Sequence, residues 1–238
     1  MSKLSVLIAA AGKGTRAGLP YPKTLHPVEG KPIIIRIIES LQAFDASPTI
    51  VVSPQGKLLI QDCLEANNKK AHFIIQKSPL GMGNAVLQFN NSPTAKDTSD
   101  ILLVWGDIPF LSEQTVSKIV NTHTKNNNSF TFASIKVNSA YTVIKRDKDN
   151  KVQSVIETRE EGIQPIAGER DIGLFVFNKS IVLDLLKEEL PGKYGKLTNE
   201  HGFLYIIKHL SLLGYQVEAL PIATDQELIS LNKLSDLR

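Results

Sequence analysis

In the first half of the chain, short apolar runs alternate with segments in which apolar residues recur at helical spacing. Leu4–Ala11 is continuously apolar, which is typical of a strand buried on both faces. From Pro32 to about Phe44, apolar residues recur every three or four positions, and Pro32 suits the first position of a helix. The same reasoning predicts strands at Thr49–Val52, His72–Gln76 and Ile101–Trp105, and helices at Lys57–Ala66, Gly83–Phe89 and Glu113–Lys125.

The second half has more strands and longer polar segments. Tyr141–Arg146 and Val152–Thr158 flank the turn-forming residues 147–151, which predicts a hairpin. Arg159–Glu169 is polar, contains glycines and a proline, and is interpreted as a loop. Further strands are predicted at Phe130–Val137, Asp171–Phe177 and Gln216–Ile222, and helices at Ser180–Leu190, from 199 to about Leu213, and at Asp225–Leu237.

This order of strands and helices predicts the α/β class. The expected architecture is a Rossmann-like mixed, mainly parallel sheet with helices on both faces and a small β lobe. The carboxyl ends of parallel strands share one edge of such a sheet, and ligands bind there. Because no repeat, low-complexity tract or linker divides the sequence, we expect one domain over residues 1–238, with about 1–130 as one half and about 131–238 as the other.

Composition narrows the class of protein. The 238 residues are 42% hydrophobic, which is enough for one large core, while the longest apolar runs are too short to cross a bilayer. The single cysteine, Cys63, excludes a disulfide framework within the chain, and we find no targeting segment. The net charge is +3 without a run of lysine or arginine. We therefore expect a cytoplasmic protein that binds neither membranes nor nucleic acid.

A glycine-rich loop follows the first predicted strand. Gly12 and Gly14 expose backbone N–H groups that can cradle phosphates. Lys13, Arg16 and Lys23 place three cations within eleven residues, which suits a triphosphate. The alternative is a structural turn with solvated cations.

Two other glycine motifs do not match this loop. A Walker loop requires lysine and then serine or threonine after its last glycine, whereas Gly14 is followed by Thr15 and Arg16. A dinucleotide-binding fingerprint requires a helix after the loop, which Pro20 and Pro22 disfavour. Phosphate binding by the loop itself remains the hypothesis.

Several segments, in the order in which they occur, form a recognisable pattern. They are Gly12–Arg16, Tyr21–Leu25, Gly30–Pro32, Gln76–Gly83, Leu103–Pro109, Val152–Glu157, Asp171–Gly173 and Leu231–Asn232. Together they resemble the sugar-phosphate nucleotidyltransferases, and in particular the uridyltransferase domain of the bacterial bifunctional N-acetylglucosamine-1-phosphate uridyltransferase/acetyltransferase. The similarity spans nearly the whole chain and is strongest in its first half.

The resemblance implies a role for each matched residue, with the first half binding the nucleotide and the second the sugar. Locally, Asp107 after its strand could either hold Mg²⁺ or cap a turn, and the Gln76 amide suits the edge of a uracil ring. The implied catalytic residues are Arg16 and Lys23, and the implied Mg²⁺ ligands are Asp107 and Asn232. The implied nucleotide-binding residues are Ala9, Ala10, Ala11, Gly12, Lys13, Gly14, Thr15, Gln76, Gly81 and Met82, and the implied sugar-binding residues are Trp105, Tyr141, Thr142, Glu157 and Asp171.

Some of these positions depart from the family pattern. Met82 stands where a threonine is usual, Thr142 where a glycine is usual, and Asp171 where an asparagine is usual. An ionised aspartate accepts hydrogen bonds but cannot donate them, so a sugar group that faces Asp171 should be a donor. Most of the departures fall on the sugar half, so the resemblance implies a nucleotide site like the family's and leaves the acceptor open.

The expected activity is Mg²⁺-dependent transfer of a nucleotidyl group, most readily from UTP, to a sugar 1-phosphate, giving an NDP-sugar and pyrophosphate. Two alternatives stay open. One is a nucleotidyltransferase that uses CTP or dTTP with another sugar or alcohol phosphate. The other is a catalytically silent nucleotide-binding regulatory protein. The sequence does not predict an oligomeric state.

Overall fold

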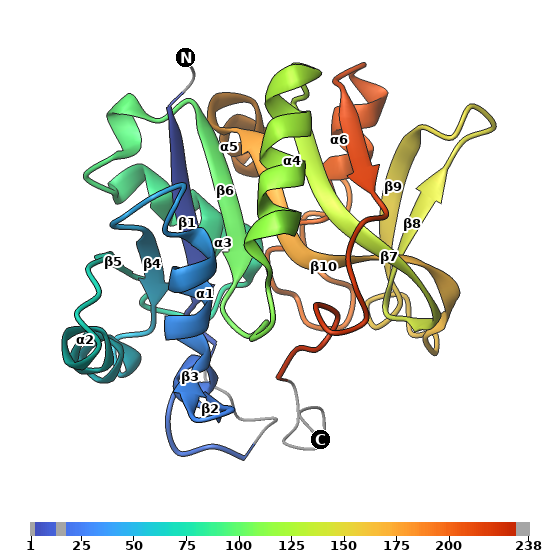
Figure 1. The fold of residues 1–238 in the computed structure, drawn as a ribbon. Helices are drawn as coiled ribbons and strands as arrows, with labels where there is room; N and C mark the ends of the chain where they lie inside the picture. The colour runs from blue at the N-terminus through green and yellow to red at the C-terminus, as the bar shows by residue number, and fades with distance from the viewer. Residues whose placement is uncertain (1–2, 13–17, 232–238) are drawn as a thin grey trace.

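The computed structural model describes residues 3–12 and 18–231, and a seven-stranded mixed sheet forms its centre (Figure 1). The strand order is β11-β7-β10-β6-β1-β4-β5. β10 runs antiparallel to both of its neighbours, and every other pair is parallel. The strands are β1 (Leu4–Ala10), β4 (Thr49–Val52), β5 (His72–Ile75), β6 (Asp100–Trp105), β7 (Phe130–Ala140), β10 (Ile166–Asn178) and β11 (Val217–Leu220).

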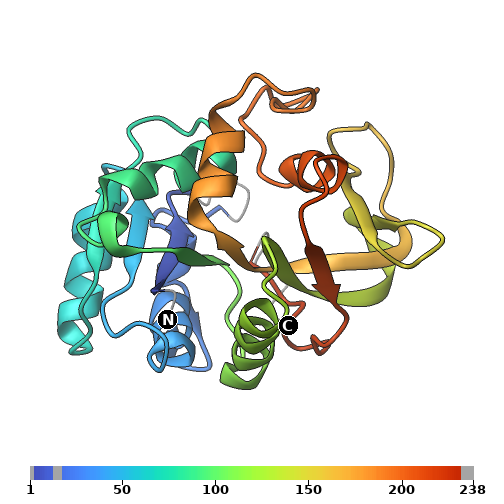
Figure 2. The ribbon, with the colours of Figure 1, turned by 90° about the horizontal axis from the view of Figure 1, so that it is seen from above.

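Helices cover both faces of this sheet, as the sequence predicts (Figure 2). In β1, Val6 and Ile8 belong to the core on one face and Leu7 to the core on the other, and all three are fully buried. The first core includes residues of α1 (Ile33–Leu41), α2 (Gly56–Ala66) and α4 (Glu113–Lys125), and the second includes residues of α3 (Met82–Leu87), α5 (Lys179–Lys187) and α6 (Ile206–Leu212). None of the described helices combines the length and apolar character needed to cross a membrane.

Short elements complete the fold. β8 (Thr142–Arg146) and β9 (Val152–Glu157) form the predicted hairpin, which projects beside β7 and β10 (Figure 1). Arg146 ties the hairpin to β10 by an ion pair with Glu169 at 2.7 Å. The remaining elements are β2 (Pro27–Val28), β3 (Lys31–Pro32) and the 3-10 helices η2 (Lys23–Leu25), η3 (Gln88–Asn91) and η4 (Ala95–Asp97).

Two predicted boundaries in the first and middle parts of the chain are wrong. Pro32 does not begin the helix, because it pairs with Pro27 in the β2–β3 ladder and its ψ of 140° is extended. Ile166–Glu169 does not belong to a loop, because these residues extend β10 along β7. Pairing with a neighbouring strand outweighs a local composition that favours a loop.

Two predicted helices near the end of the chain are also wrong in part. The segment from 199 to 205 is not α-helical, because Asn199 has a φ of 55° and His201 pairs with Tyr194 in an isolated bridge. Asp225–Leu228 forms a turn, where the buried Glu227 accepts hydrogen bonds from Thr224. A carboxylate that bonds locally to the backbone stabilises a turn.

One core contains a cluster of five phenylalanine rings. Ring centroids of neighbouring members lie 5.4–6.0 Å apart. Phe203 joins the cluster from the segment before α6, so it fixes that segment to β10. The members are Phe130, Phe132, Phe175, Phe177 and Phe203.

We expect Phe203→Ala to lower the free energy of unfolding by about 3–5 kcal/mol, because it leaves a cavity among rigid rings. Urea denaturation measures this loss. Leu58→Ala is the control, since Leu58 of α2 is 65% exposed and its truncation should change stability by no more than about 0.5 kcal/mol. Equal losses in the two variants would contradict the packing role of Phe203.

Candidate active site

The carboxyl ends of β1 and β6 lie side by side at one edge of the sheet. Ala9 is the register partner of Trp105, and the N–H of Gly106 donates to the Ala9 carbonyl at 3.0 Å. A Cβ added to Gly106 would lie 2.7 Å from that carbonyl oxygen, so only glycine allows this approach. The two segments that follow these strands, Ala11–Gly12 and Asp107, therefore begin at the same edge.

Asp107 is a buried carboxylate, 8% exposed, at this edge. Its Oδ2 forms an ion pair with the Nζ of Lys23. Its Oδ1 is buried and has no hydrogen-bond partner among the described residues. A buried carboxylate requires compensation by a cation or by donors, and here one of its two oxygens has none within the described chain.

Lys23 opens η2, and its side chain lies near both Gly12 and Asp107. A Cβ added to Gly12 would lie 3.7 Å from the Cε of Lys23, so the lysine stem passes close to the loop backbone. The sequence predicts separate roles for Lys23 and Asp107, and the structure brings the two side chains into contact. Lys13, Gly14, Thr15, Arg16 and Asn232 lie outside the described residues.

The last described residue also reaches this edge. The N–H of Leu231 donates to the backbone carbonyl of Asp107 at 2.9 Å. Leu231 is fully buried in the core beneath the site. The residue next in sequence is Asn232, which the resemblance pairs with Asp107.

Gln76 follows β5 at the same edge and is 7% exposed. Its Nε2 donates to the Gly81 carbonyl at 3.1 Å and to Oδ1 of Asn84 at 2.9 Å. These two acceptors match the two N–H donors of the amide. The side-chain oxygen of Gln76 therefore remains as its acceptor for a ligand. Asn84 orients this amide, and no sequence signal pointed to it.

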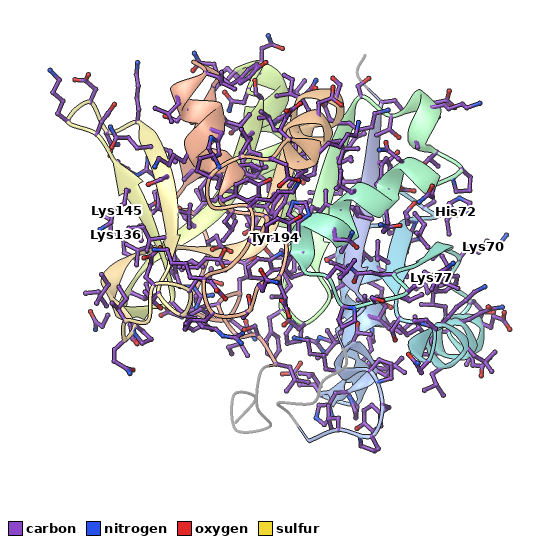
Figure 3. The ribbon with its side chains drawn as sticks, turned by 180° about the vertical axis from the view of Figure 1, so that it is seen from behind. Lys70, His72, Lys77, Lys136, Lys145 and Tyr194 are labelled. Atoms are coloured by element: carbon purple, nitrogen blue, oxygen red, sulfur yellow. The ribbon has the colours of Figure 1, made fainter. Side chains whose placement is uncertain are left out.

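The loop after Gln76 is joined to the second half of the chain. The N–H of His201 donates to the Leu80 carbonyl at 2.8 Å, and the N–H of Gly83 donates to the His201 carbonyl at 3.0 Å. The Tyr194 ring lies 5.9 Å from that of His201. In Figure 3, Tyr194 lies between Lys77, which belongs to the first half of the chain, and Lys145 of the β8–β9 hairpin. These backbone bonds hold the two halves together beside the candidate base site.

The contact between the loop after Gln76 and His201 requires a glycine at position 81. Its φ is +101°, and an added Cβ would lie 2.7 Å from the backbone nitrogen of His201. Met82, the next residue, begins α3 and packs in part against the core that contains α3 and α6. The three alanines at the end of β1 also line this edge, with Ala10 buried and Ala9 and Ala11 partly exposed.

Trp105 is one of the residues that the sequence assigns to the sugar. Its ring packs on Gly173, where φ is +82° and an added Cβ would lie 2.8 Å from a ring carbon. The Trp105 Nε1 is buried without a hydrogen-bond partner in the part of the chain that the structure describes. An unpaired buried N–H is costly, so this donor is available to a ligand group.

The other residues that the sequence assigns to the sugar lie where β8 meets β10. Tyr141 is 40% exposed, and its ring lies 3.9 Å from the guanidinium carbon of Arg170. Thr142 and Asp171 are buried and hydrogen-bonded to each other at 2.6 Å. Burial is the largest cause that raises the pKa of Glu157, and with the neighbouring Asp171 and Glu160 carboxylates it brings that pKa to about 7, whereas Arg159 opposes the shift.

Comparison with solved structures defines the class of fold. A UDP-glucose pyrophosphorylase in complex with UDP-glucose aligns with a TM-score of 0.72 at 19% identity, over 96% of each chain. HddC from Yersinia pseudotuberculosis aligns with a TM-score of 0.70 at 20% identity, over 98% of this chain and 95% of that one. At these identities the likeness establishes the fold, which is the nucleotide-diphospho-sugar transferase type predicted from the sequence.

Sequence comparison then establishes the family. Residues 6–170 match the MobA-like NTP transferase domain, and the chain belongs to this nucleotidyltransferase family. Bifunctional protein GlmU from Prochlorococcus marinus is 30% identical over 217 residues, 88% of this chain and 46% of that protein. The one from Syntrophomonas wolfei is 28% identical over 223 residues, 92% of this chain and 47% of that protein. The chain thus spans about half the length of these relatives, and the predicted resemblance is confirmed.

We expect Gly81→Ala to destabilise the protein by at least about 1 kcal/mol more than Gly162→Ala. Both glycines have positive φ, but no atom lies within 4 Å of a Cβ added at Gly162, whereas His201 blocks one at Gly81. Gly81 also has a ψ of 175°, a combination that is essentially restricted to glycine, so strain and the steric clash with His201 both act there. Urea denaturation measures the two losses. Equal destabilisation would show that the Gly81–His201 contact does not constrain the loop.

Proposed function

We propose that this chain transfers a nucleotidyl group from a nucleoside triphosphate, most readily UTP, to a sugar 1-phosphate, giving an NDP-sugar and pyrophosphate. The observation that carries the proposal is the contact between Lys23 and the half-satisfied carboxylate Asp107 beside the glycine loop. Lys23, a cation that can bind phosphate, and Asp107, a carboxylate that can bind a metal ion, lie in contact at the sheet edge. Membership of a nucleotidyltransferase family supports the same reaction class.

Magnesium is the cofactor that we propose. Asp107 offers a buried oxygen without a partner among the described residues, and Mg²⁺ prefers such hard carboxylate ligands. Those residues include no group of three or more His, Cys, Asp or Glu placed to enclose a metal. This suits Mg²⁺, which commonly uses one or two carboxylates together with substrate phosphates and water. When bound, it would neutralise charge on the phosphates, with Asn232 proposed as the second ligand.

The residues of the chain act by positioning and by electrostatics. A phosphate oxygen of the acceptor, already ionised at neutral pH, attacks the α-phosphorus in line, the new P–O bond forms, and the bond to pyrophosphate breaks. No general base is needed. Lys23 would exchange its Asp107 partner for the α-phosphate and stabilise charge on the equatorial oxygens. Arg16 and the Gly12–Thr15 backbone are proposed to hold the leaving pyrophosphate.

The base is proposed to bind between the β1 end and the loop after β5. The Gln76 side-chain oxygen, which has no hydrogen-bond partner among the residues described, can accept from the N3–H of uracil or thymine. It could also accept from the exocyclic amine of cytosine. The amine of adenine and the N1–H of guanine are donors of the same kind, so the Gln76 oxygen alone does not select the base, and competition among triphosphates must select UTP.

Removing Lys23 tests the centre of this proposal. We expect Lys23→Ala to lower kcat by on the order of a hundredfold or more, since it removes charge stabilisation at the reacting phosphate. Lys187→Ala is the matched control, because the Lys187 side chain is 54% exposed on α5 and pairs with Asp184. Steady-state pyrophosphate release measures both. If Lys23→Ala retained wild-type turnover, the assignment of Lys23 would be wrong.

A substrate panel tests the reaction itself. We expect pyrophosphate release with UTP and Mg²⁺ when N-acetylglucosamine 1-phosphate or another sugar 1-phosphate is supplied, and slower release with CTP, dTTP or GTP. The assay pairs each triphosphate with each acceptor, alcohol phosphates included. A preference for CTP would overturn the uridylyl assignment. No release across the whole panel would favour the nucleotide-binding regulatory protein instead.

A further inference from the structure

Asp171 is completely buried, and both of its oxygens are engaged inside the protein. Its Oδ1 accepts a hydrogen bond from Oγ1 of Thr142 at 2.6 Å, and its Oδ2 accepts one from the N–H of Gly173 at 3.0 Å. A residue so enclosed does not present its carboxylate to a ligand. Asp171 acts on its protein neighbours instead.

Thr142 lies next to both Asp171 and Glu157. In the hairpin ladder, Thr142 is the register partner of Glu157, so β10, β8 and β9 place these three residues in one row. Thr142 and Asp171 are also two of the positions that depart from the family pattern. The departures contact each other, since the hydroxyl that replaces a glycine donates to the carboxylate that replaces an asparagine. Glu157 is only partly buried and is the member of the row that remains accessible.

The charges around Glu157 come from three elements. Asp171 faces it from β10, Glu160 and Arg159 from the turn after β9, and Glu200 from the segment before α6. Three of these four groups are carboxylates. Burial, together with this excess of negative charge, raises the pKa of Glu157 to about 7.

We propose that Asp171, which Thr142 holds in this row by a hydrogen bond, is a positioning residue for the acceptor side of the site, and that its charge determines when Glu157 is ionised and can accept hydrogen bonds from acceptor hydroxyl groups. This inference rests on the proposed function and assigns a role that the family pattern does not contain. Ionised carboxylates form the stronger, charge-assisted hydrogen bonds, so the ionised form of Glu157 binds the acceptor.

The direction of the pH effect follows from this assignment. With a pKa of about 7, Glu157 is roughly one-tenth ionised at pH 6 and nine-tenths ionised at pH 8. The KM for the acceptor therefore falls about tenfold from pH 6 to pH 8. Asp171→Asn keeps the shape of the residue but removes its charge, which lowers the pKa of Glu157. More of Glu157 is then already ionised at pH 6, so the change in KM becomes smaller than about tenfold.

The experiment measures the KM for N-acetylglucosamine 1-phosphate, or for the sugar 1-phosphate that the panel selects, against pH. The second ionisation of the acceptor phosphate lies near pH 6 but is common to all variants, so it cancels in their comparison. Asp171→Asn should make the KM for the acceptor depend less on pH. Glu157→Gln should remove the part of this pH dependence that the Glu157 carboxylate causes. Asp184→Asn is the control, since the Asp184 side chain is 70% exposed on α5. At each pH, the KM for UTP should be the same in these variants as in the wild type. An Asp171→Asn profile like that of the wild type would overturn the inference.

A second measurement needs no substrate. In protein labelled with ¹³C at the glutamate carboxyl, Glu157→Gln identifies the Glu157 resonance, and titration gives its midpoint in the wild type and in Asp171→Asn. A lower midpoint in Asp171→Asn supports the coupling even if no acceptor is turned over, in which case the proposed function alone fails. An unchanged midpoint overturns the role of Asp171, whatever the substrates are.

Discussion

The parallel pairing of β1 with β6 is the constraint on which the rest of the site depends. Six register pairs, from Leu4 with Asp100 to Ala9 with Trp105, lie in the centre of the sheet between two cores. Buried backbone groups must be hydrogen-bonded, so this register is strongly specified, and a shift by one residue would turn every side chain to the opposite face. The close approach of Gly106 to Ala9 then fixes where the glycine loop and Asp107 begin.

The charges at that edge form an arrangement suited to ligand exchange. A buried carboxylate without a cation is strongly unfavourable, and Lys23 supplies the cation to one oxygen of Asp107. In the proposed function, a phosphate would become the new partner of Lys23 and a metal ion would become the new partner of Asp107. Binding of both together would therefore preserve the charge balance that the protein alone maintains. Such an arrangement agrees with catalysis by positioning and charge neutralisation.

The two halves of the chain are connected beside this edge by two kinds of contact. Backbone hydrogen bonds join Leu80 and Gly83 to His201, and these leave no room for a side chain at Gly81. On the acceptor side, the Thr142–Asp171 hydrogen bond joins the hairpin to β10. The first contact is made by backbone and tolerates little change. The second is made by side chains, Thr142 and Asp171, which are two of the positions that the sequence analysis finds to depart from the family pattern.

The local sequence determined those helices and strands whose bounds depend only on residues close to them in the chain. The strand Thr49–Val52 and the helix Glu113–Lys125 were predicted at their observed bounds, since the pattern of apolar positions is readable over a few residues. In the structure, Ser112 caps this helix by accepting a hydrogen bond from the N–H of Thr115. The position of Asp107 at the sheet edge followed from the same reasoning.

Tertiary structure alone decided the contacts between distant residues. Ile166–Glu169 became strand because β7 offered a partner. The Lys23–Asp107 pair joins residues 84 positions apart, and the Thr142–Asp171 bond joins residues 29 apart. Periodicity and motif spacing carry no information about which side chains meet across such separations. The sequence therefore determined the fold class and which residues to examine, whereas packing decided that Lys23 neutralises Asp107 and that Asp171 faces the protein.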